Sequence, residues 1–191
     1  MSRPNYNTYN RIGENAFGKM EKLSGELLSM TYGSLVTQLL KDLDHVQVVN
    51  EQLEKMGFNI GIRLVDEFLA KSGVGACQDF RETCEVIARV GLKMFLGIAG
   101  EVGGWNSEMT ACSISLPENP LCHDFVELPP SLGDLCYSNL LCGVVRGALE
   151  ELHMKVNVFF LKDTLKGDDS TEIRIELKQI LAETFVDDED N

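Results

Sequence analysis

The stretch SGVGACQDFRET, residues 72–83, places a cysteine in a loop of small residues directly before a predicted helix. Cys77 precedes the expected N-cap residue Asp79 by two positions, and Glu82 three residues later completes a capping-box pattern. The positive end of a helix dipole favours the thiolate, the nucleophilic form of cysteine, whereas Asp79 adds a negative charge that opposes it. The loop is therefore a candidate site for covalent chemistry on Cys77.

The helix after this loop carries a stripe of small residues. Cys84, Ala88 and Gly91 follow one another at helical spacing. Small side chains on a core face leave room for either a neighbouring helix or an apolar ligand. Periodicity alone leaves both readings open, and plain helix packing with a structural thiol is the commoner case.

The rest of the chain shows no pattern of a catalytic or metal site. The three histidines, His45, His123 and His153, stand in unrelated contexts, and the cysteine spacings match no zinc-ligand pattern, so we expect no metal. Gly73-Val74-Gly75 begins like a dinucleotide fingerprint, but Gln78 occupies the third glycine position. The sequence also lacks G-x-S-x-G and Walker A motifs, so neither a nucleophile elbow nor a P-loop is expected.

Composition restricts the partners. The chain has 191 residues, a net charge of −13 and 44% hydrophobic residues. An acidic chain without a basic face disfavours nucleic acid and direct adhesion to anionic lipid. Neither a membrane-spanning run nor the apolar segment of a secretory signal is visible, so we expect a cytoplasmic protein with its six cysteines reduced.

The pattern of apolar residues divides the chain into a flexible N-terminal arm (1–20), one domain (21–182) and an acidic C-terminal tail (183–191). Periods of 3.6 residues predict four main helices, at about 23–43, 45–71, 79–96 and 132–152. Alternating residues predict strands at 112–116, 156–160 and 173–177, the last two as a hairpin, and a glycine-rich loop at 97–107. This order predicts an α+β fold with the helices packed on one face of a small twisted antiparallel sheet.

Six blocks of sequence between about Leu27 and Ile175 resemble the Bet-three family of subunits of the transport protein particle (TRAPP), a vesicle-tethering complex. They occur in the family's order and are long enough to be specific. The blocks are MTYGSLVTQLLKD, KMGFNIGIRLVDEFLAKS, CQDFRETCEVIARVGLKMFLGI, NPLCHDFVELP, YSNLLCGVVRGALE and DTLKGDDSTEIRI.

This resemblance implies a non-catalytic core subunit that pairs with itself or with related TRAPP subunits. It implies a role in ER-to-Golgi transport, peripheral location at the cis-Golgi and endoplasmic reticulum, and an assembled complex that exchanges guanine nucleotide on a Rab-family GTPase. The resemblance also implies a palmitate attached covalently to Cys77, in an internal hydrophobic channel. The small residues Cys84, Ala88 and Gly91 would then line that channel.

The acyl chain is expected to be buried in the protein. Burial at ~0.8 kcal/mol per CH₂ amounts to roughly 11 kcal/mol, which rivals the net stability of a whole domain. Ala76 departs from the family, where the residue before the cysteine is commonly basic, and this removes a charge that would activate the sulfur. A fatty-acyl carrier or a self-acylating thiol acyltransferase using Cys77 is the alternative, but an acyltransferase requires a base in reach, and no histidine is near in sequence.

Overall fold

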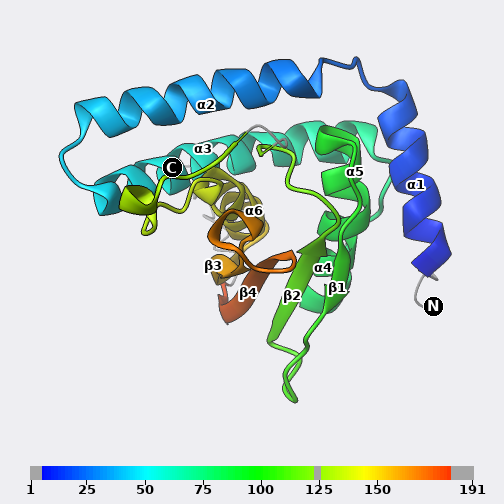
Figure 1. Cartoon of the computed structure of the whole chain (residues 1–191). Helices are drawn as coiled ribbons and strands as arrows, with labels where there is room; N and C mark the ends of the chain where they lie inside the picture. Colours follow the sequence, from blue (N-terminus) through cyan, green and yellow to red (C-terminus); the bar gives the residue numbers. More distant parts are fainter. Residues whose placement is uncertain (1–5, 123–125, 182–191) are drawn as a thin grey trace, which may run out of the picture.

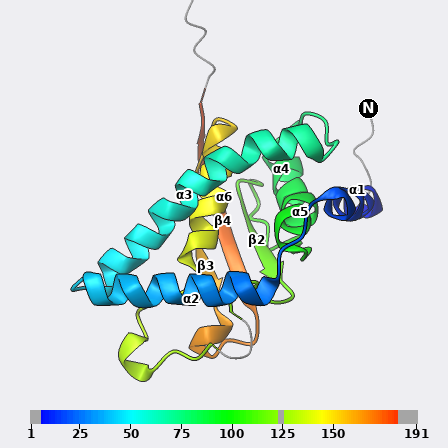
Figure 2. The same ribbon diagram turned by 90° about the horizontal axis from the view of Figure 1, so that it is seen from above.

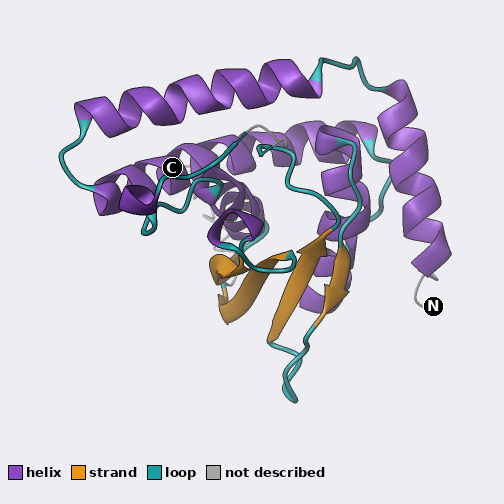
Figure 3. Cartoon of the chain, viewed as in Figure 1, coloured by secondary structure: helices purple, strands orange, loops and turns teal. Residues whose placement is uncertain are grey.

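The computed structural model describes residues 6–122 and 126–181. Five long helical segments lie on one side of a four-stranded sheet, as Figures 1 and 3 show. The helices are α1 (Tyr6–Lys19), α2 (Gly25–Asp42), α3 (Val46–Lys71), a segment running from α4 (Phe80–Val86) into α5 (Leu92–Leu96), and α6 (Asn139–Glu151). The strands are β1 (Glu101–Gly103), β2 (Ala111–Leu116), β3 (Met154–Lys162) and β4 (Thr171–Ile180).

The sheet is antiparallel throughout, in the order β1-β2-β4-β3. The predicted hairpin is confirmed, because β3 pairs with β4 across the short 3-10 helix Thr164–Lys166. On β4, Ile173 and Ile175 face the helices and are buried, while the alternate residues are more exposed. The α+β fold with helices on one face of a small sheet is therefore as the sequence predicts.

The helices α3 and α6 cross in very close contact at the centre of the molecule (Figure 2). Glycines make this crossing possible from both sides. A Cβ added at Gly57 would lie 2.0 Å from the Leu140 carbonyl oxygen, and one at Gly143 would lie 2.0 Å from the Glu54 carbonyl oxygen. Gly57 is therefore a point of close packing between the two helices.

The N-terminal segment corrects a prediction. Residues 6–19 were expected to belong to a mobile arm, but they form α1, which packs against the helix from α4 to α5. Its polar sequence hides a narrow contact face, on which Tyr9 and Ala16 are 6% and 3% exposed. The acidic tail 183–191 lies outside the described residues.

Two shorter elements also differ from the sequence-based expectation. The stretch expected as a glycine-rich loop contains β1, which pairs with β2 through Val102 opposite Ile114. The last main helix begins at Asn139 rather than near 132, because residues 130–132 form a separate 3-10 turn that starts with a proline.

Candidate acyl-attachment site

Cys77 lies in the loop between the end of α3 and the start of α4. The side chain of Asp79 caps α4 by accepting a hydrogen bond from the Glu82 backbone N–H at 2.8 Å. Glu82 in turn accepts from the backbone N–H of Gln78 at 2.7 Å. The predicted capping pattern is therefore present, with the return bond made one residue before the cap.

Cys77 packs against a small apolar cluster. Tyr9 of α1 and Val86 and Val90 of the following helix are buried in its centre. Cys77 packs against them from the loop, together with Phe68 near the end of α3 and two further partly buried residues, Ile12 and Val74. The thiol is thus half-buried among apolar side chains, a setting that suits an acyl chain better than a charged substrate.

The electrostatic surroundings do not activate this thiol. Burial raises the pKa of Cys77 above its ordinary value, and the charges of Glu82 and Asp79 raise it further. A hydrogen bond with the Thr83 side chain acts in the opposite direction and is outweighed. The helix terminus that would favour the thiolate is overcome by burial and by the acids that cap it.

The small residues of the stripe belong to a different cluster from Cys77. Cys84 and Ala88 are fully buried in the main core, which also contains residues of α3, α6 and the sheet. The thiol of Cys84 shares a hydrogen bond with Cys112 of β2, and this bond and burial raise its pKa. These two residues therefore face the core from the same helix whose other face carries Cys77's neighbours.

Gly91 stands apart, because a Cβ added there would meet only the Val86 carbonyl oxygen, at 3.9 Å. It closes a π-helical turn, Ile87–Gly91, that interrupts the helix between α4 and α5. Such turns frequently occur at functional sites. Sequence periodicity assumed an unbroken α-helix, whereas the extra residue of this turn shifts the face on which Gly91 lies relative to Cys84 and Ala88. The open side of Gly91 is consistent with an acyl channel, which stays a prediction.

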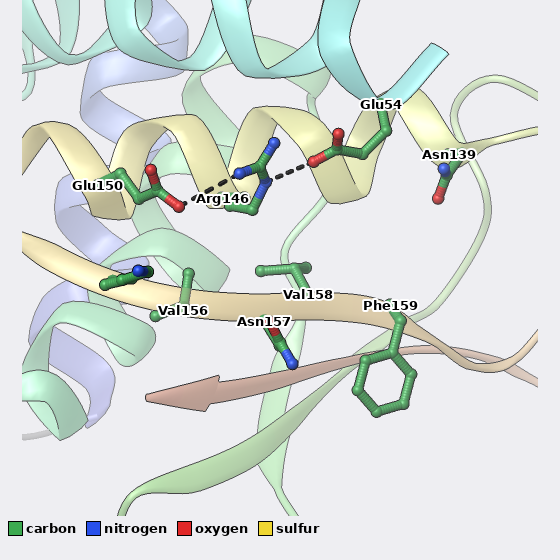
Figure 4. A pocket seen from close by; sticks show the side chains of 9 residues that line it. Glu54, Asn139, Arg146, Glu150, Val156, Asn157, Val158 and Phe159 are labelled. Atoms are coloured by element: carbon green, nitrogen blue, oxygen red, sulfur yellow. Dashed lines mark hydrogen bonds and ion pairs between the residues drawn. The ribbon is translucent and has the colours of Figure 1, made fainter. Parts of the chain in front are cut away.

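A separate cavity of about 420 Å³ lies between α6 and β3 (Figure 4). At this cavity Arg146 donates from Nε to the Glu54 carboxylate and from Nη1 to the Glu150 carboxylate at 3.3 Å, so the arginine is ion-paired with both acids. The Arg146 guanidinium also stacks over the Phe58 ring at 4.4 Å. These contacts connect α3 to α6. All three charged groups, Glu54, Arg146 and Glu150, are used in the ion pairs.

Of the two described histidines, His45 lies far from Cys77 along the length of α3. His45 precedes α3, whose 26 residues span about 39 Å, and Cys77 follows the opposite end of that helix. His153 joins α6 to β3 in a left-handed conformation, and His123 lies outside the described residues. Within residues 6–122 and 126–181 no group of three or more His, Cys, Asp and Glu side chains is placed to hold a metal ion. The same ranges contain no helix long and apolar enough to cross a bilayer.

The comparisons define the class of protein. The model of the family described as transport protein particle (TRAPP) component matches residues 28–176. The chain therefore belongs to the TRAPP component family, whose members are subunits of a vesicle-trafficking complex.

Known relatives narrow this to one kind of subunit. The chain is 52% identical to "Trafficking protein particle complex subunit 3" of Dictyostelium discoideum, over 92% of this chain and 94% of that one. It is 49% identical to "Transport protein particle subunit bet3" of Schizosaccharomyces pombe, over 91% and 94%.

Solved structures agree. A crystal structure of trafficking protein particle complex subunit 3 from Naegleria fowleri, covalently bound to palmitic acid, is 53% identical and superposes with a TM-score of 0.80. It covers 85% of this chain and is matched over its whole length. The phenol-responsive sensory domain of PoxR, 15% identical with a TM-score of 0.54, shares the fold alone, over 83% of this chain and 76% of its own.

Proposed function

We propose that this chain is a non-catalytic core subunit of a TRAPP complex in ER-to-Golgi transport, and that it carries a palmitoyl chain as a thioester on Cys77. The observation that carries the proposal is the position of Cys77. Its sulfur meets an apolar cluster beside a helix with an open side at Gly91, and a relative of 53% identity is covalently bound to palmitic acid.

The reaction needs no enzyme machinery from this chain. The Cys77 sulfur bonds to the carbonyl carbon of an acyl thioester, and the donor's thiol leaves with the proton that Cys77 loses. Burial then stabilises the product, because each CH₂ removed from water contributes about 0.8 kcal/mol. A single acyl chain anchors a protein to a bilayer stably only with a second signal such as a polybasic patch. This protein has a net charge of −13 and no such patch, so the palmitoyl chain is proposed to be buried inside the protein.

The assembly role fits the surface of α2. Leu27 and Met30 on this helix are 59% and 63% exposed, and Leu23 just before it is 85% exposed. Exposed apolar side chains on one helix are typical of a subunit interface. We propose that this surface pairs with a second copy or a related subunit, and that the assembled complex acts on a Rab GTPase at the cytoplasmic face of the cis-Golgi and endoplasmic reticulum.

Intact mass spectrometry of the protein purified from a eukaryotic host tests the acylation. A palmitoyl increment that hydroxylamine removes is expected in the wild type and in Cys136→Ser, a matched change at another partly buried thiol. The increment should be absent from Cys77→Ser. An unmodified wild-type mass, or an increment that survives Cys77→Ser, would refute this assignment.

A second measurement separates the subunit from an acyltransferase. With excess acyl-CoA, a structural ligand gives one acyl group per chain and then stops. Continued release of coenzyme A beyond one equivalent would favour the enzyme. The assembly role is tested independently, by sedimentation of the purified chain with other TRAPP subunits.

A further inference from the structure

The helix α1 lies along the outer side of the helix that follows Cys77, as the views in Figures 1 and 2 agree. The two backbones come very close, since a Cβ added at Gly13 would lie 2.4 Å from the Arg89 carbonyl oxygen. Glu14 pairs with Lys93 at 2.9 Å further along the same contact. The helix is therefore seated on the α4–α5 segment over much of its length.

The first turns of α1 reach the loop that carries Cys77. The Tyr9 hydroxyl donates to the Glu82 carboxylate at 2.5 Å, and the other oxygen of that carboxylate accepts from Gln78, the residue after Cys77. Tyr9 also fills the centre of the apolar cluster against which the Cys77 side chain packs. One carboxylate thus connects α1 to the loop, and the ring of Tyr9 belongs to the cluster against which Cys77 packs.

This attachment is limited enough to be reversible. Only two side chains of α1 in the described part of the chain, Tyr9 and Ala16, are buried hydrophobics. The link from α1 to α2 is exposed, with Leu23 at 85%. Elements with few buried contacts and an exposed link open at low free-energy cost, without global unfolding. The helix also lies outside residues 28–176, the part that matches the family model.

We infer that α1 is a lid on the acyl-attachment site. Seated on the α4–α5 segment, it covers the sulfur of Cys77. Lifted from the segment, it uncovers the sulfur to an acyl donor or to a nucleophile that cleaves the thioester. This inference rests on the proposed function for its purpose, but the shielding itself is a property of the free thiol and is measured without any acyl group.

Two valine substitutions in the full-length chain provide the test. Gly13→Val places side-chain atoms against the Arg89 backbone and unseats α1, whereas a Cβ added at Gly18 of the same helix meets nothing within 4 Å. Protein stripped of any acyl group with hydroxylamine is treated with iodoacetamide, and modification of each cysteine is followed by peptide mass spectrometry. The rate at Cys77 should rise at least about tenfold in Gly13→Val and stay within about twofold of wild type in Gly18→Val.

Cys112, which is 0% exposed in the main core, reports whether the variant stays folded. If Cys112 also becomes reactive in Gly13→Val, that variant is unfolded and a second variant, Ala16→Gln, is used instead. It places a polar side chain at a buried position of α1, two turns from Tyr9. Faster modification of Cys77 with a protected Cys112 in either variant supports the lid. The lid is overturned if Cys112 stays protected in Gly13→Val and the modification rate of Cys77 is unchanged. Where Ala16→Gln decides, the lid is overturned if the modification rate of Cys77 is unchanged or if Cys112 becomes reactive.

The same variants keep the two proposals distinguishable. If the wild-type mass shows no acyl group, the proposed attachment fails, while the iodoacetamide ratio still decides the lid. If the wild type is acylated, hydroxylamine should release the palmitoyl group faster from native Gly13→Val than from native Gly18→Val, by a similar factor. Equal release rates would mean that α1 does not cover the thioester.

Discussion

Replacing Gly143 with alanine should destabilise the protein at the crossing of α3 and α6. The new Cβ would lie 2.0 Å from the Glu54 carbonyl oxygen, whereas ordinary contact begins at 3.4 Å. The helices must then separate by roughly 1 Å, and a gap of that size forfeits a quarter to a half of the dispersion energy of the atoms that face it. Overpacking of this kind costs about 1–3 kcal/mol or more, while alanine returns about 1 kcal/mol through helix propensity.

Because neither a Cβ nor a backbone carbonyl oxygen can rotate away, we expect a cost of about 3 kcal/mol, at the upper end of that range, and a net loss of about 2 kcal/mol after the gain in helix propensity. For a chain of this size such a loss lowers the Tm by about 4–8 °C. Thermal unfolding followed by circular dichroism measures it, with Gly18→Ala as the matched control in open space. A Gly143→Ala variant that melts within 2 °C of wild type would show that the crossing is looser than described.

Three further predictions concern charge and assembly. Asp79→Asn keeps an N-cap but removes a charge that raises the pKa of Cys77, so that pKa should fall and alkylation near pH 7.5 should become faster, as a pH profile of the rate will show. Arg146→Ala leaves Glu54 without its ion-pair partner and should cost about 1–2 kcal/mol, because the pair is only partly buried; urea unfolding measures this, and no loss would mean that water replaces the arginine. Leu27→Asp on the exposed face of α2 should shift sedimentation toward the monomer without lowering the Tm, and an unchanged oligomer would exclude this face as the interface.

Much of the fold follows from local patterns in the sequence. The apolar period of residues 45–71 predicts α3 to within a residue of its observed bounds, because a long helix with one core-facing stripe repeats its signal many times. The strand alternation around Ile173 and Ile175 identifies β4 for the same reason. Where an element is long and faces one core, its own residues contain the information that defines it.

The elements missed by sequence reasoning depend on partners far along the chain. α1 has few apolar residues, and its seat is created by a backbone approach between Gly13 and Arg89. β1 is only three residues long and exists through its pairing with β2. The separation of Cys77 from Cys84 into two clusters follows from which faces of the α4–α5 segment α1 and the sheet cover, and no local spacing reveals that.

The pKa of Cys77 is shifted in the direction opposite to the one that the helix dipole alone would give. The acids that cap α4 organise the loop, and together with burial they raise the pKa of the thiol. At neutral pH the sulfur is therefore a poor nucleophile by itself. The same apolar side chains that raise its pKa can bind an acyl chain, and a bound donor gains a high effective concentration next to the sulfur. Acylation at this site should consequently depend on acyl-chain length more strongly than on pH, since binding in the apolar cluster, and not thiolate formation, supplies the selectivity.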